Sequence, residues 1–445
     1  MRAWRWVRGF LGRQRPVRLV AGGYALYVLI GFGLLCLPWA QEAEDVAWLD
    51  HLFIATSAVS TTGLASISPA DSYSCFGELV IIGLIQLGGI GYMTLGSFFM
   101  LAVRHRLDSL HTKVARQAFV LPRGMELARF IRGVVLFTFV IEAVGAAILV
   151  PAFMAADVPA PVWNGIFHAI SAFCTAGFSL FNNSLEGFRD DVVINLTIAA
   201  LSILGALGFI VMSDVWRLAR GRPGRVSLTS VIILRVTFGL MIVGTLLIGL
   251  TDDALAALPM GERWLAAFFQ TMTAMTTVGF DTYAINDMAL ASLLLIVVAM
   301  VIGASPSGTG GGVKSTTAAV FLGAIVAMLR GRERIVLAGR EIDTARVNSA
   351  LAAFAFYMIC LITGTFALLL TQAGGFVPLI FEATSAIGTV GLSLGATATL
   401  DDTGKWVIIV LMFLGRLGPL TAGLALLPSP QDARRLRARR EDLAV

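Results

Sequence analysis

The sequence is short of charge, of clustered cysteine and of clustered histidine. Only 14% of its 445 residues are charged, whereas a soluble domain carries about 25%. Its four cysteines form no CxxC pair and its four histidines show no ligand spacing, which argues against a disulfide framework or a zinc site. The apolar segments also contain no paired carboxylates and no nucleophile–histidine arrangement. We therefore expect no enzyme.

The sequence is rich in long apolar segments. Hydrophobic residues make up 57% of the chain, and its mean hydropathy is +0.83. A helix needs about 20 apolar residues to cross roughly 30 Å of hydrocarbon. Candidate runs occupy 19–38, 76–102, 131–153, 192–213, 227–250, 288–303, 316–329, 349–372 and 405–427. The first run lacks a small-residue cleavage site, so we predict a polytopic membrane protein that retains it as a span.

Basic residues gather in short segments between these runs. The arginine clusters occupy 2–18, 104–132, 217–235, 330–346 and 434–440, whereas the other connections are mainly acidic. The positive-inside rule places the arginine-rich segments, and both termini, on the cytoplasmic side. We predict a multi-pass protein of the bacterial cell (inner) membrane, with its acidic connections outside.

Four stretches of eleven residues align without a gap. Each begins with Phe, has Ala at its sixth place and Thr at its ninth, and ends with Gly. They read Phe53-IATSAVSTT-Gly63, Phe167-HAISAFCTA-Gly177, Phe269-QTMTAMTTV-Gly279 and Phe381-EATSAIGTV-Gly391, with the final glycines 114, 102 and 112 residues apart. Self-similarity at this spacing indicates one unit repeated four times.

Each unit is predicted to contain a span, a short helix, a glycine-containing loop and a second span. The short helices, at about 48–60, 162–174, 263–275 and 376–387, are too brief to cross a bilayer. Non-helical backbone at membrane depth is tolerated only where protein buries it or where it lines a watery cavity. We therefore predict an all-α polytopic membrane protein with four tandem helix–pore helix–filter loop–helix repeats around one pseudo-four-fold pore.

These assignments divide the chain into repeats and cytoplasmic segments. The repeats are 19–103, 131–216, 227–329 and 347–427, the third with a broken second span at 303–317. Between and beside them lie a basic N-terminus at 1–18, linkers at 104–130, 217–226 and 330–346, and a basic tail at 428–445.

The Thr-x-Gly ends of the four stretches suit a partly dehydrated alkali cation. Consecutive backbone carbonyls supply oxygen ligands without a charged side chain, and glycine tolerates the unusual dihedrals that such a loop needs. A threonine hydroxyl can add an oxygen at the inner end. Helix-packing glycines are the alternative, which four copies in register disfavour. The predicted filter residues are Thr61, Thr62, Gly63, Thr175, Ala176, Gly177, Thr277, Val278, Gly279, Thr389, Val390 and Gly391.

A glycine-rich stretch, Ile302–Ala318, interrupts the second span of the third repeat. Residues 308–315 nearly match the phosphate-binding pattern GxxxxGK[ST], but Val313 stands where the pattern needs glycine and no strand precedes the stretch. A flexible connection between two shorter helices is a second interpretation. A gate is the third, because the cation of Lys314 would repel potassium from the permeation path.

Five segments carry a family resemblance to the Trk/Ktr/HKT superfamily of potassium-uptake proteins. They are the loops from Thr277 and Thr389, the run Gln86-LGGIGYMT-Leu95, the glycine-rich stretch 303–317 and the stretch Gly415-RLGPLT-Ala422. Because its first repeat begins close to the N-terminus, the chain is most similar to the KtrB-type membrane subunit of this superfamily. The resemblance implies a potassium-translocating subunit, and four filter glycines favour potassium over sodium.

The resemblance also implies a gate and partners. The gate residues would be Gly308, Gly310, Gly311, Gly312, Lys314 and Arg416, although Arg416 could instead be a structural counter-ion. KtrB-type subunits form homodimers on a cytoplasmic KtrA-type ring that binds nucleotide. We expect no nucleotide on this chain, and its basic segments would meet that ring, anionic lipid or both. A sodium-coupled potassium transporter with alternating access is the alternative, and sodium as an activator stays open.

Four polar residues beside the filter have simpler interpretations. Glu382, His168 and Gln270 occupy the second place of their stretches, where hydrogen bonding along the helix is expected rather than ion binding. Asp281 follows the third filter and would either attract cations or cap the loop.

Overall fold

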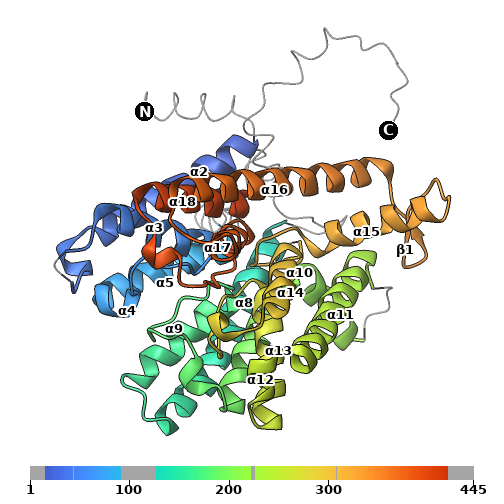
Figure 1. Ribbon diagram of the computed structural model, residues 1–445. Helices are drawn as coiled ribbons and strands as arrows, with labels where there is room; N and C mark the ends of the chain where they lie inside the picture. The colour runs from blue at the N-terminus through green and yellow to red at the C-terminus, as the bar shows by residue number, and fades with distance from the viewer. Residues whose placement is uncertain (1–15, 44, 92–126, 222–225, 307, 419–445) are drawn as a thin grey trace, which may run out of the picture.

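The computed structural model describes residues 16–43, 45–91, 127–221, 226–306 and 308–418. Figure 1 shows the chain passing round the bundle in sequence order, from blue through green and yellow to red. The predicted tail at 428–445, most of the linker at 104–130 and most of the N-terminus at 1–18 lie outside the described residues. So do the later parts of the predicted spans 76–102 and 405–427.

The described helices follow one order four times. A long helix comes first: α2 (Pro16–Leu35), α8 (Leu127–Ala155), α11 (Leu228–Thr251) and α16 (Thr344–Thr371). A shorter buried helix follows: α3 (Trp48–Ser60), α9 (Pro161–Phe173), α13 (Met260–Thr276) and α17 (Phe376–Gly388). The second span closes each unit: α5 (Cys75–Ile90), α10 (Val192–Ala219), α14 (Leu290–Val301) with α15 (Ser315–Leu329), and α18 (Asp402–Leu417).

Within the described residues, the connections between these helices contain short elements. They are η1 (Pro38–Ala40), α4 (Pro69–Ser72), η2 (Glu186–Phe188), α12 (Asp253–Ala256), η3 (Ile285–Asp287), η4 (Thr397–Thr399), β1 (Val336–Leu337) and β2 (Arg340–Glu341). The two strands form an antiparallel hairpin after α15. This small hairpin is a departure from the expected purely helical chain.

The long helices have the length and surface of membrane spans. Among the described residues, three helices are long and apolar enough to cross a bilayer, and α10 makes a fourth if its bent halves count as one span. Large aliphatic side chains face outward on them: Ile359 and Ile362 on α16 are 61% and 63% exposed. An outer surface of this kind is suited to lipid rather than to water.

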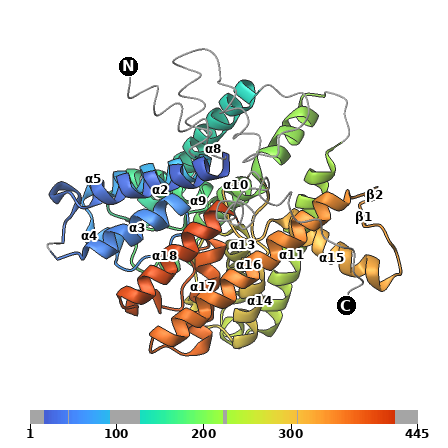
Figure 2. The same ribbon diagram turned by 90° about the horizontal axis from the view of Figure 1, so that it is seen from above.

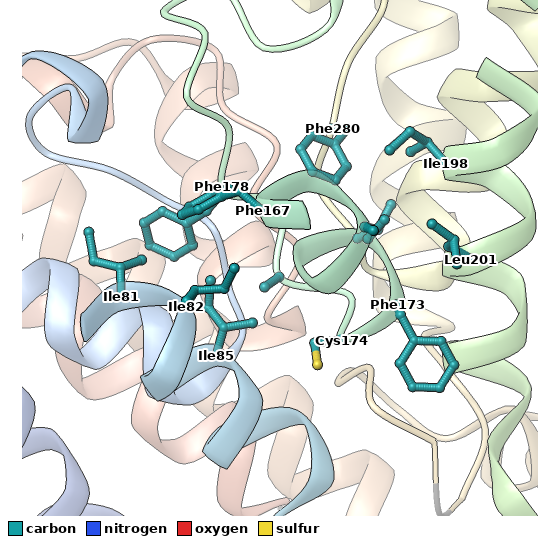
Figure 3. Packing of buried hydrophobic residues seen from close by; sticks show 14 of the residues in the cluster. Ile81, Ile82, Ile85, Phe167, Phe173, Cys174, Phe178, Ile198, Leu201 and Phe280 are labelled. Carbon is teal, nitrogen blue, oxygen red and sulfur yellow. The ribbon is translucent and has the colours of Figure 1, made fainter. Parts of the chain in front are cut away.

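The short helices form the core. The Phe at the first place and the Ala at the sixth place of each stretch are buried, at no more than 1% exposure in any copy. In Figure 3, Phe167 and Phe173 of α9 lie between Ile81, Ile82 and Ile85 of α5 on one side and Ile198 and Leu201 of α10 on the other. Close packing on both sides explains why small and aromatic residues recur at fixed places.

The first and last repeats meet directly. The Lys405 ammonium of α18 lies 2.6 Å from the Asp50 carboxylate of α3, and both side chains are nearly buried. Beside this ion pair the rings of Trp48 and Trp406 pack with centroids 6.3 Å apart. We call this junction of α3 with α18 the seam.

A glycine with positive φ ends or bends the described helix in three of the four second spans. These are Gly91 (φ 82°) at the end of α5, Gly208 (φ 79°) inside α10 and Gly418 (φ 78°) at the end of α18. Another glycine three residues earlier, at 88, 205 and 415, packs against a carbonyl of the short helix in its own repeat. Only glycine leaves room for that approach. In the third repeat, the stretch between α14 and α15 takes the place of this break.

Candidate ion-conduction site

The ninth residue of each stretch is a threonine in a left-handed backbone conformation. The φ angles of Thr61, Thr175, Thr277 and Thr389 are 51°, 51°, 58° and 48°. Each directly follows, or lies within two residues of, the end of its short helix. This region costs a β-branched residue roughly 1–3 kcal/mol, and such strain persists where the surroundings enforce it, often at functional sites. The same strain in four copies marks these loops as the candidate site.

The four predicted filter glycines form a closed ring. Their φ angles are 89°, 66°, 87° and 100° in sequence order. A Cβ atom placed on any of them would collide with the carbonyl oxygen just before the filter glycine of the next repeat. The pairs are Gly63 with Ala176, Gly177 with Val278, Gly279 with Val390 and Gly391 with Thr62. The structure therefore brings all twelve predicted filter residues together, with the repeats in chain order around one axis.

A hydroxyl at the fifth place of each stretch supports the loop, and the sequence interpretation missed it. The Gly391 amide donates to the Ser385 hydroxyl at 3.0 Å. Gly63 bonds in the same way to Ser57, and Gly279 to Thr273, each at 3.1 Å. The second repeat differs, because the Ser171 hydroxyl donates instead to the Phe178 carbonyl at 2.8 Å. The recurrence of Ser or Thr at this place was the available signal.

This difference gives a matched pair of variants. Ser385→Ala should leave the half-buried Gly391 amide without its acceptor, which costs about 1 kcal/mol. We expect a lower Tm and a weaker potassium-over-sodium preference. Ser171→Ala removes the donor to the buried Phe178 carbonyl and not the acceptor of a ring amide, so it should also lower the Tm but leave the ion preference near wild type. Thermal unfolding in detergent and competitive uptake measure the two effects; an equal loss of ion preference in both variants would contradict the assigned support.

Polar residues at the second place of three of the eleven-residue stretches bind the segment that follows the ring glycine. The Glu382 carboxylate accepts hydrogen bonds from the Ser393 hydroxyl at 2.6 Å and the Leu394 amide at 2.9 Å. The Gln270 amide group donates to the Tyr283 carbonyl at 2.7 Å. His168 lies 3.0 Å from the Ser179 hydroxyl. These side chains therefore fix the segments that leave the filter. The backbone of Asp281 ties the third loop to the second, since its carbonyl accepts from the Leu185 amide at 2.9 Å.

The stretch between α14 and α15 lies against the inner threonines of the ring. The Thr309 hydroxyl is 3.1 Å from the Thr175 hydroxyl of the second repeat and 3.2 Å from the Phe173 carbonyl. The Gly311 amide donates to the Thr277 hydroxyl at 3.0 Å. Gly311 also approaches the Thr389 side chain so closely that a Cβ would not fit. Three of the four repeats thus contact this stretch through the threonine expected at the inner end of the filter.

Two basic side chains, those of Lys314 and Arg416, bind the same stretch. The Lys314 ammonium donates to the Gly310 carbonyl at 2.6 Å. The Arg416 guanidinium donates to the carbonyls of Thr309 and of Gly88, and so joins the stretch to the first repeat. Of the remaining predicted gate glycines, Gly308 packs on the Ala206 carbonyl and Gly312 (φ 69°) on Gly303. The predicted gate residues therefore form one cluster that includes Arg416.

A second polar cluster behind the ring was not predicted. The Gln86 amide donates to the Glu142 carboxylate at 3.0 Å, and the Cys174 thiol lies 3.4 Å from the Gln86 oxygen. Cys174 directly precedes Thr175, and Glu142 is only 3% exposed. Residues on α5, α8 and α9 meet here through packing alone. Because these three residues lie far apart in the sequence, no local pattern could have predicted that they meet.

Comparison with known proteins agrees with this geometry. A family described as a cation transport protein, TrkH, matches residues 33–435. The Ktr system potassium uptake protein B of Vibrio alginolyticus is 35% identical over 416 residues, which is 90% of each chain. The potassium/sodium uptake protein NtpJ of Enterococcus hirae is 34% identical over 427 residues, or 93% of each chain.

The fold is also shared with a solved structure. The crystal structure of the potassium transporter TrkH from Vibrio parahaemolyticus superposes with a TM-score of 0.72 at 20% identity, over 94% of this chain and 86% of that chain. The likeness confirms the predicted fold class, and the relatives confirm the resemblance to the Trk/Ktr/HKT superfamily. The family transports cations and is not a family of enzymes. The chain belongs to the TrkH family of cation transport proteins.

Proposed function

We propose that this chain is the potassium-translocating membrane subunit of a bacterial uptake system. The observation that carries the proposal is the closed ring of four Thr-x-Gly loops. Each loop follows the carboxyl end of a short helix, which is the negative end of its dipole and favours a cation. Backbone carbonyls and the inner threonine hydroxyls would then replace the water around potassium. The names of the relatives support potassium as the transported ion, since protein B of the Ktr system is named as a potassium uptake protein.

The stretch from Gly308 to Lys314 is proposed as the gate. It contacts the inner threonines of three repeats, and the cations of Lys314 and Arg416 lie on it. Positive charge and backbone at this place oppose the passage of potassium from the filter to the cytoplasm. Movement of the stretch, with loss of these contacts, would open the path.

The assembly and orientation are part of the same proposal. The relatives' names describe components of a Ktr system, which supports an assembly of more than one kind of subunit. The proposed form of that assembly is a homodimer that docks on a separate KtrA-type nucleotide-binding ring. The repeats 19–103, 131–216, 227–329 and 347–427 would span the inner membrane with both termini in the cytoplasm. No nucleotide site is proposed on this chain.

The ring favours a pore over alternating access. Four loops in cyclic contact have the same direction and one axis, whereas transporters with alternating access commonly pair inverted repeats. The relative NtpJ is named as a potassium/sodium uptake protein. The uptake experiment therefore examines sodium both as an activator and as a competitor of potassium.

Uptake by cells tests the proposal directly. The chain, with its native regulatory partner, should restore growth at low potassium in a bacterium that lacks its own uptake systems. Labelled rubidium uptake should be inhibited by potassium far better than by sodium, and its dependence on external sodium measures activation. Restored uptake of sodium without potassium, or a strict fixed ratio of both ions, would contradict the proposed pore.

A further inference from the structure

A cavity of about 270 Å³ lies between the last turns of α15 and the hairpin that follows. Both figures of the whole chain show the hairpin beside α15 at one edge of the molecule (Figures 1 and 2). Leu322, Val326 and Leu337 supply an apolar floor. Arg330, Arg332 and Arg334 supply a basic rim. One end of the cavity is therefore apolar and the other strongly positive.

The hairpin is held in place by packing on α15. Gly323 allows the approach, since a Cβ there would lie 2.8 Å from Leu337 and 3.2 Å from Ile335. The turn after α15 is closed by the Arg332 amide, which donates to the Ala327 carbonyl at 2.9 Å. The rim arginines are thus set on an ordered turn rather than on a free chain.

Two of the three rim charges are unpaired within the described part of the chain. Arg334 is bonded to the Glu341 carboxylate at 3.0 Å, but no ion pair is found there for Arg330 or Arg332. None of the lining residues is acidic, and Asp343 is engaged in capping α16. The cavity therefore lacks an anion beside two arginines.

We propose that this cavity binds the headgroup of an anionic phospholipid of the inner leaflet. The phosphate would meet Arg330 and Arg332, and an acyl chain would follow Val326 and Leu322 along the apolar surface of α15, where these two side chains are 44% and 56% exposed. Basic pockets of this kind on the cytoplasmic side suit anionic headgroups. The inference rests on the membrane orientation given under the proposed function. Because α15 begins at Ser315, directly after Lys314, lipid bound here restrains the helix that continues the proposed gate.

Lipid binding to the purified full chain tests the inference without measuring ion flux. Native mass spectrometry would follow titration with phosphatidylglycerol or phosphatidylcholine in detergent. The double variant Arg330→Gln/Arg332→Gln should weaken phosphatidylglycerol binding about 25-fold, at roughly fivefold for each charge. Arg340→Gln, on the same hairpin but outside the cavity, is the matched control and should bind as wild type.

Two further arms separate the explanations. The charge-preserving variant Arg330→Lys/Arg332→Lys should retain most of the binding, which distinguishes lost charge from lost fold. Millimolar inorganic phosphate should not displace the lipid. Equal phosphatidylglycerol binding by wild type and the double glutamine variant, or full displacement by inorganic phosphate, would overturn the assignment. Either result would leave the potassium pore untouched, because that proposal is tested by uptake.

Discussion

The variant Gly279→Ser is expected to lower the potassium-over-sodium preference by about tenfold or more. Gly279 has a φ of 87°, and a Cβ there would collide with the Val390 carbonyl and approach Gly391 at 2.9 Å. A side chain at positive φ costs about 1–3 kcal/mol, and each 1.4 kcal/mol is a factor of ten. The strain falls on carbonyls that would bind the ion, so selectivity changes before the fold does.

Competitive rubidium and sodium uptake in cells measures this effect. Gly261→Ser is the matched control: it lies on the same helix, α13, where a Cβ would meet nothing within 4 Å. The control should keep both uptake and selectivity. An unchanged ion preference in Gly279→Ser, with normal expression, would rule out the ring as the filter.

Deletion of residues 308–312 is expected to raise potassium flux in the absence of the regulatory ring. The deletion removes the contacts of Thr309 with Thr175, of Gly311 with Thr277 and of Arg416 with Thr309. Each hydrogen bond contributes about 1 kcal/mol to holding the stretch in place. Three of them correspond to a change in open population on the order of a hundredfold. Rubidium flux into proteoliposomes with the purified chain alone measures it.

A milder variant protects this prediction from a folding failure. Lys314→Gln removes the ammonium bonded to the Gly310 carbonyl and leaves the chain length intact, so flux should rise several-fold. Arg346→Gln, an exposed change at the start of α16, should leave flux unaltered. If neither the deletion nor Lys314→Gln changes the flux, the stretch is not the gate.

The short helices were predictable because their pattern is local. A buried face and a strained end recur within eleven residues, so the interval 48–60 coincides with α3 and 376–387 lies within α17. The helical fold followed from composition and span length. The residues of the ring could be picked out for the same reason, since each loop carries its own Thr-x-Gly sequence independently of the other repeats.

What escaped the sequence depends on contacts between distant segments. The order of the repeats around the axis appears only when the Gly63 backbone meets Ala176 and the Gly391 backbone meets Thr62. The grouping of Gln86, Glu142 and Cys174 likewise arises from three helices packing together. The hydroxyls at the fifth place were visible, but their role depends on which backbone group each one reaches. Ser171 shows that the same residue type can donate where its counterparts accept.

The seam has a consequence for how such a pore can originate. The peptide chain joins the first repeat to the second, the second to the third and the third to the fourth, but not the fourth to the first. That last junction is made by side chains of α3 and α18, including the Asp50–Lys405 pair. Because the ring of four repeats closes at this junction without a peptide bond, the other three junctions do not in principle need one either. The architecture is therefore what gene duplication and fusion would leave from an ancestor assembled from separate subunits, after which each quarter was free to acquire its own sequence.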